Sequence, residues 1–170
     1  MMSDAIKLQM AIDQISATRD YTKSLLEDIH FDDWFQQPPG ETTHVGWQVG
    51  HLAMAQYGLA LYRQRGRNLE DGDLMNSSFR KKFSRGTTVS RDPDFYPSAT
   101  EILAVFDGIH DHVMMELKEY PLDQLNDTVE PPYAAYPTKL GCLLFCAHHE
   151  MLHAGQIGLL RRLLGKAPIR

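Results

Sequence analysis

Apolar side chains recur every three to four residues in four long stretches of the chain, separated by polar segments rich in glycine and proline. The stretches cover roughly residues 4–28, 41–66, 98–120 and 138–165. This spacing places the apolar side chains on one face of a helix, where other helices can bury them. The pattern therefore predicts an all-α protein, and the four stretches predict a four-helix bundle.

The ends of the later stretches carry helix-capping signals. Ser98 and Glu101 have the spacing of a capping box. Thr138 stands at an N-cap position, and Gly165 at the place where a left-handed residue ends a helix. Within the second stretch, Gly58 costs about 1 kcal/mol relative to alanine, which suggests that another helix packs closely there.

A long polar connection, residues 66–97, joins the second stretch to the third. Connections in helical bundles usually have about 2–8 residues, and longer ones tend to cross the bundle or to be functional. We expect a short helix over Ser77–Phe83. Basic residues gather there, and we interpret them either as a solvated face or as a patch that attracts an anionic substrate: Arg80, Lys81, Lys82 and Arg85.

The fourth stretch is apolar on nearly all sides rather than on one face. A helix without a clean polar face is usually buried on more than one side, so we expect a homodimer interface here. The residues that widen its apolar surface are Leu143, Leu144, Ala147, Met151, Leu152, Ala154, Ile157 and Leu159.

Three histidines are placed to face the interior. His149 and His153 are four residues apart, so their imidazoles differ by about 40° in direction and about 6 Å in height on a helix. His51 shares an apolar stripe of the second stretch with Trp47 and Met54. Imidazoles on facing helices of a bundle are a common way to bind a metal ion. A cluster of buried histidines joined by water is the alternative interpretation.

The remaining histidines of the helical stretches are less favoured as ligands. His148 points about 100° away from its neighbour, and His44 is seven residues before His51, about 10 Å along the axis, where it could line the mouth of a site. His110 and His112 are two residues apart and point in nearly opposite directions. We expect both at the surface or at its boundary.

Other side chains near the histidine pair have a structural and a functional interpretation. Cys142 and Cys146 are four residues apart in an apolar helix, which favours core packing over a disulfide; Cys146 as a metal ligand or reactive thiol is the second interpretation. Gln156 is a candidate for contacting a ligand histidine. Glu150 is angled away from the histidine stripe, and we expect it to pair with a basic residue of another element.

The letters from His149 to His153 match HExxH, the signature of zinc peptidases, in which the glutamate activates a metal-bound water. Such an enzyme needs a third ligand downstream. The 17 residues after His153 contain no His, Asp or Glu. We interpret the match as a coincidence of helical spacing and keep a zinc peptidase as the less favoured alternative.

Size and charge set limits on the class of protein. The chain has 170 residues, the size of one ordinary domain, and we expect a single domain over residues 1–170. Its net charge of -5 and scattered basic residues argue against nucleic-acid binding. The N-terminus lacks a signal-peptide pattern, and the longest apolar run, residues 142–147, is too short for a membrane span. We expect a cytoplasmic protein that has no contact with membranes.

The segments GWQVGHLAMAQ and HHEMLHAGQIGLLRRLLG resemble the DinB-like family of helical metalloenzymes. The resemblance runs through nearly the whole chain, including the Pro-Pro-Gly segment before the second stretch. It implies a four-helix bundle, often dimeric, that binds a divalent metal through three histidines. Carried over to this chain, that histidine triad is His51, His149 and His153, with zinc, nickel or iron as the ion.

The resemblance also implies a class of activity. Relatives include thiol-dependent transferases and isomerases that use low-molecular-weight thiols such as bacillithiol or mycothiol, and metal-dependent hydrolases. Our leading hypothesis is a metal-dependent enzyme of this kind that acts on a small molecule, with a small thiol as possible partner. The alternative is a non-catalytic, metal-binding helical dimer with a stress-related or metal-sensing role.

Overall fold

The computed structural model describes residues 2–40, 43–130 and 136–169. Within these ranges the protein is all-helical, as predicted; no strand is present there, although an isolated β-bridge joins Thr128 to Thr138. The elements, in chain order, are α1 (Asp4–Leu26), η1 (Phe31–Asp33), α2 (Val45–Tyr57), the π-helical η2 (Gly58–Tyr62), α3 (Arg63–Arg65), α4 (Asp71–Leu74), α5 (Ser77–Phe83), η3 (Pro93–Phe95), α6 (Ala99–Lys118), η4 (Leu122–Gln124) and α7 (Lys139–Leu163).

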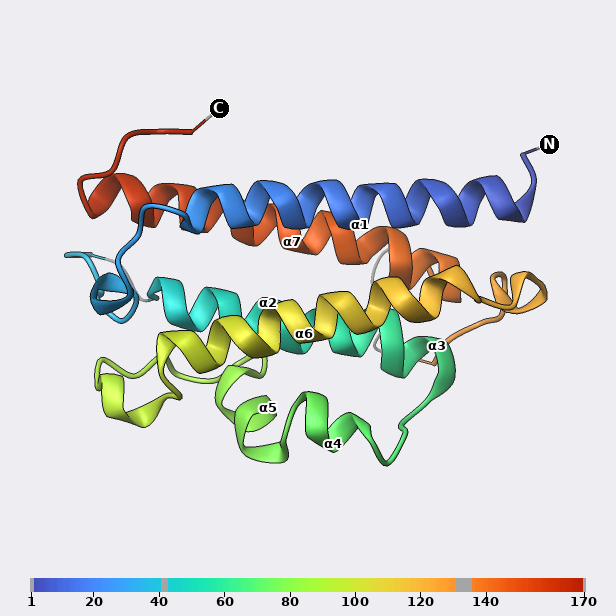
Figure 1. Ribbon diagram of the computed structural model, residues 1–170, viewed down its shortest axis with the longest axis horizontal. Coiled ribbons are helices and arrows are strands. Elements are labelled where there is room, and N and C mark those ends of the chain that lie inside the picture. The colour runs from blue at the N-terminus through green and yellow to red at the C-terminus, as the bar shows by residue number, and fades with distance from the viewer. Residues whose placement is uncertain (1, 41–42, 131–135, 170) are drawn as a thin grey trace.

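The long helices form two pairs, α1 with α7 and α2 with α6, and α2 also packs against α7 (Figure 1). Within each pair the helices run in the same direction, and the two pairs run in opposite directions. A chain that leaves the end of α2 and α3 must therefore return along the molecule before α6 can begin. This requirement explains the length of the connection over residues 66–97, which carries α4, α5 and η3.

The predicted helix ends agree with the structure to within a few residues where they can be compared. Thr138 caps α7, and Ser98 and Glu101 form the capping box of α6. The second helix begins at Val45 rather than near Glu41, which lies outside the described residues. The short helix over Ser77–Phe83 is confirmed, whereas α4 and the 3-10 segments have no counterpart in the prediction.

The expectation for Gly58 is wrong. A side chain added at this position would meet no atom within 4 Å, so no helix packs closely there. Gly58 is instead the first residue of the π-helical turn. Another helix does pack closely against α2 at Gly50, where an added Cβ would lie 2.5 Å from the ring of Phe83 on α5.

A buried ion pair joins the long helices at the centre of the molecule. Arg19 of α1 donates to both carboxylate oxygens of Glu150 on α7, at 2.8 and 3.1 Å. It also donates to Gln56 of α2 and to the carbonyl of Phe106 on α6, each at 2.7 Å. Both charged side chains are at most 4% exposed. The predicted pairing of Glu150 with a basic residue of another element is thus confirmed.

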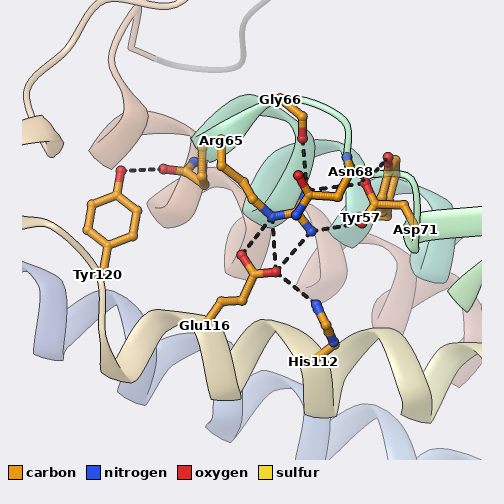
Figure 2. A network of polar contacts seen from close by, with 9 residues as sticks. Tyr57, Arg65, Gly66, Asn68, Asp71, His112, Glu116 and Tyr120 are labelled. Atoms are coloured by element: carbon orange, nitrogen blue, oxygen red, sulfur yellow. Dashed lines mark hydrogen bonds and ion pairs between the residues drawn. The ribbon is translucent and has the colours of Figure 1, made fainter.

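A second polar network fastens the start of the long connection to α6 (Figure 2). Arg65 of α3 bridges Glu116 of α6 and Asp71 of α4, at 2.8 Å to each. The hydroxyl of Tyr57 donates to Asp71 at 2.9 Å, and a ring nitrogen of His112 lies 2.8 Å from Glu116. These bonds hold α4 beside the end of α2 and so fix where the connection departs.

The apolar surface of α7 is only partly buried within the single chain. Its core residues include Cys142, Leu143, Ala154 and Ile157, but Met151 and Leu152 are 45% and 65% exposed. Leu159 and Leu163 are also exposed. None of the described helices combines the length and apolar character that a membrane span requires.

Arg19→Met should lower the free energy of unfolding by about 3–5 kcal/mol, because it leaves the carboxylate of Glu150 buried without its partner. Arg19→Met combined with Glu150→Met should recover part of the loss, since no lone charge then remains. Urea unfolding in the presence of a chelator measures both. The matched control, Lys23→Met, removes an exposed partner of Asp107 and should cost at most about 1 kcal/mol. Equal effects for Arg19→Met and Lys23→Met would contradict this account.

Asp71 should make stability depend on acid pH. Burial disfavours its ionised form, but hydrogen bonds from Arg65, the backbone N–H of Asn68 and Tyr57 outweigh burial and hold its pKa at about 2. The ordinary value is 3.8, so the stabilisation is complete above about pH 4 and is lost as the pH falls through 2. Asp71→Asn should therefore lose about 2 kcal/mol at neutral pH and little at pH 2.

Urea unfolding of wild type and Asp71→Asn at several pH values provides the measurement. Asp73→Asn, on the exposed side of α4, is the control and should show no such trend. A deficit in Asp71→Asn that stays constant from pH 7 to pH 2 would disprove the assignment.

Candidate metal centre

Three histidines from two helices converge in the interior. His51 lies on α2, and His149 and His153 lie one turn apart on α7, which crosses α2 in the opposite direction. One candidate ligand atom from each lies within 4.8 Å of the others. The ring centroids are 4.6–5.3 Å apart. Among the described residues, no other group of three His, Cys, Asp or Glu side chains is placed to share an ion.

Hydrogen bonds fix the orientation of two of the rings. Nδ1 of His51 lies 2.8 Å from the carbonyl oxygen of Phe83, and Nδ1 of His153 contacts the side-chain oxygen of Gln48. A carbonyl oxygen can only accept, so each Nδ1 carries the proton and each Nε2 keeps a free lone pair. Gln48 is held in turn by its own amide, which donates to Thr43 at 2.9 Å. This is how proteins commonly orient histidine ligands.

Burial keeps all three imidazoles neutral at neutral pH. It lowers the pKa of His51, lowers that of His149 to about 4, and lowers that of His153 to about 3. The neighbouring histidines add a smaller effect in the same direction, because two adjacent imidazolium charges repel each other. The neutral ring is the form that binds metal.

The donor set fits a divalent ion. Imidazole nitrogens suit zinc, copper, iron and nickel. Two nitrogens that each lie about 2.1 Å from one ion are at most about 4.2 Å apart, so small rotations of the rings would bring the set to bonding distance. Three imidazoles leave coordination positions for a substrate, which is typical of catalytic rather than structural sites.

A pocket of about 660 Å³ adjoins the triad. Trp47 and Gln48 line it, and both contact the histidines: Trp47 stacks on His51 with ring centroids 4.8 Å apart, and Gln48 accepts from His153. None of the three histidines lines this pocket itself, so it meets the triad only through these two side chains. A second cavity, of about 610 Å³, lies at the C-terminal end of α1 beside Phe31 and Trp34, and its lining includes no triad histidine and neither Trp47 nor Gln48. The pocket beside the triad is therefore the one suited to a reacting substrate.

His44 does not line the mouth of the site. Its ring is fully buried against Phe35 and Tyr96, and its Nδ1 accepts from the backbone N–H of Trp47 to cap α2. Burial lowers its pKa to about 4. His44 is thus the N-cap of α2. Its position just before the apolar stretch suits a cap, but histidine is not among the residues preferred there.

The other candidates fall outside the cluster as well. His148 is exposed, while His110 is half-buried and accepts from Gln56 in the Arg19 network. Cys146 is buried, and burial raises its pKa to about 12, so it remains a thiol in the core. Gln156 is exposed and lines the pocket without contacting a triad histidine.

Glu150 is not available as a peptidase base. Its carboxylate is 4% exposed and faces α1, where Arg19 binds both of its oxygens. A base in that role must reach water at the metal. The described residues also contain no strand that would hold an extended peptide. In the HExxH match, the two histidines are thus candidate metal ligands on one face of α7, and the glutamate forms an ion pair with Arg19 on the neighbouring face.

Comparison with known families agrees with this site. The family model of the DinB superfamily matches residues 14–157, a range that includes all three histidines, the whole of α2 and α7 as far as Ile157. The chain belongs to the DinB superfamily. A search of curated proteins found no match to it.

Gln48 and Phe83 are the site residues of this DinB-superfamily protein that sequence reasoning missed. Gln48 is a polar residue in an otherwise apolar run, three residues before His51 and hence on the same face of the helix, which was an available signal. Phe83 contributes a backbone carbonyl from the long connection. Any residue type supplies a carbonyl, so its identity carried no signal.

Gln48→Met should weaken metal binding about 10–100-fold, because it removes the acceptor that holds the proton of His153 on Nδ1. Competition with a chromogenic chelator measures the affinity. Gln156→Met is the control, since it makes the same change on the exposed side of the pocket, and it should alter the affinity less than about threefold. Equal losses in the two variants would show that Gln48 does not orient the ligand.

Proposed function

We propose that this protein binds one divalent metal ion through His51, His149 and His153 and is a metal-dependent enzyme that acts on small molecules. The observation that carries the proposal is the convergence of three neutral imidazoles. In His51 and His153 a carbonyl acceptor holds the proton on Nδ1 and leaves the Nε2 lone pair free for the ion. When bound, the ion would polarise a substrate oxygen or hold a thiolate as a nucleophile.

The surroundings favour a catalytic site over a purely structural one. A closed structural site usually has four protein ligands, whereas the described residues offer three here. His149 and His153 are only half-buried. The pocket is lined by Trp47 and Gln48, the side chains that contact His51 and His153. In this site Trp47 supports the face of His51, and Gln48 and the Phe83 carbonyl hold the imidazole protons away from the ion.

The type of reaction rests on the resemblance to thiol-dependent members of the family. We propose transfer involving a low-molecular-weight thiol, with metal-dependent hydrolysis as the second type, and zinc, nickel or iron as the ion. The size of the pocket supports a small molecule as the substrate.

The proposal includes a single four-helix-bundle domain over residues 1–170, a cytoplasmic location and a homodimer. The two cysteines are buried and unpaired, which suits a reducing compartment. The exposed Met151 and Leu152 on α7 offer apolar surface for a partner chain. Light scattering should give twice the chain mass at micromolar concentration, and the monomer mass would contradict the dimer.

Protein purified without an affinity tag should contain about one metal ion per chain by mass spectrometry. His51→Ala and His149→Ala should contain almost none, because two imidazoles bind far more weakly than three. His148→Ala, which removes an exposed neighbour on the same helix, should load like wild type. Absence of metal from reconstituted wild type would refute the proposal.

Metal removal then separates a catalytic ion from a structural one. We expect chelated protein to keep its helical circular dichroism, because the Arg19–Glu150 pair and the apolar core do not depend on the ion. Turnover of a small thiol with an electrophile such as 1-chloro-2,4-dinitrobenzene should fall to the buffer rate and return with metal. Loss of helical signal on chelation would identify a structural ion instead.

A further inference from the structure

We infer that the pocket beside the triad takes a substrate that carries a carboxylate, and that Arg91 is the residue that recognises it. The inference rests on the proposed function, because it assumes that the substrate reacts at a metal ion bound by the three histidines. It adds a chemical class of substrate and a residue that determines specificity.

The lining of the pocket mixes apolar and neutral polar side chains and is almost free of charge. Beside Trp47 and Gln48 it presents threonine and glutamine side chains, including Thr87, Gln37 and Gln156. Among the described lining residues, Arg91 is the one charged side chain. A small neutral pocket with a single cation favours a ligand with one negative charge.

Arg91 is oriented but not neutralised. Its Nε donates to the side-chain oxygen of Gln37 at 2.8 Å. No described carboxylate pairs with it, although the chain has 22 acidic residues against 17 basic ones. The two terminal nitrogens therefore remain available, and together they match the two oxygens of a carboxylate.

The opposite side of the Gln37–Arg91 pair is unsuited to an anion. These two residues also border a shallower hollow of about 440 Å³ whose lining includes Asp32. The charge of Asp32 repels an anion on that side, so an anion bound by Arg91 is favoured on the side of the triad. A carboxylate at Arg91 would place the rest of a small molecule along Trp47 and Gln48.

The probes are ω-mercaptocarboxylates of increasing chain length, each compared with the neutral ω-mercaptoalcohol of the same length. In metal-free protein, binding is read from the indole N–H NMR signal of Trp47, which donates to Thr87 in the pocket wall. In cobalt-loaded protein, binding of the thiol is read from thiolate-to-cobalt absorption.

At one chain length or more, the carboxylate should bind about tenfold more tightly than the alcohol, the order expected of a charge-assisted pair near the surface. Arg91→Gln should abolish this preference and leave the affinity for the alcohol and for cobalt unchanged. Arg85→Gln removes the same charge from the same connection outside the pocket and should keep the preference.

Equal affinity for carboxylate and alcohol at every length would overturn the inference, as would a preference that survives Arg91→Gln or is lost in Arg85→Gln. The two readouts separate this failure from failure of the proposed function. A carboxylate preference at Trp47 without any thiolate-to-cobalt band would leave the Arg91 site standing and would reject the metal centre.

Discussion

The buried pair of Arg19 and Glu150 is the constraint on which the arrangement of the long helices depends. A buried charge is strongly unfavourable unless its partner and its hydrogen bonds are in place. Arg19 meets this condition only when α2, α6 and α7 all stand at their observed positions, because each supplies one of its acceptors. A packing that moved any of these helices away would leave part of this buried charge without a partner, so we infer that the pair favours the observed arrangement.

The same pair sets the rotation of α7 and thereby the direction of its histidines. Residues one apart on a helix differ by about 100°, so a helix that turns Glu150 towards α1 turns His149 and His153 towards α2. There they meet His51. The HExxH letters thus combine two ligands with a structural carboxylate, and the glutamate contributes to the site by orienting the helix.

The long connection takes part in the site as well as linking the helices. Gly50 lets the ring of Phe83 lie against α2, and this contact brings the Phe83 carbonyl to His51 one residue further on. Further along, the connection supplies Thr87 and Arg91 to the pocket. The network around Arg65 fixes the point from which it departs.

How much of the structure the sequence predicts depends on how far apart in the chain the interacting residues lie. The helices and the three inward histidines were predictable because helical periodicity and capping are local. Glu150 was correctly predicted to pair with a basic residue of another element. Its partner Arg19 could not be named, because it is 131 residues away and no local pattern marks the pairing. Phe83 and Arg91 reach the site through the tertiary packing of the long connection, which has no regular pattern in the sequence. The prediction of a close helix contact at Gly58 was wrong because a glycine within a helix marks either a close contact or a change in helical geometry.

Anomalous diffraction from crystals of the metal-loaded protein tests the central claim most directly. The account predicts one peak about 2.0–2.1 Å from the Nε2 atoms of His51 and His153 and from a ring nitrogen of His149, with Glu150 still bound to Arg19. Coordination through Nδ1 of His51 or His153, coordination by Cys146 or Glu150, or a peak at another place in the molecule would contradict it.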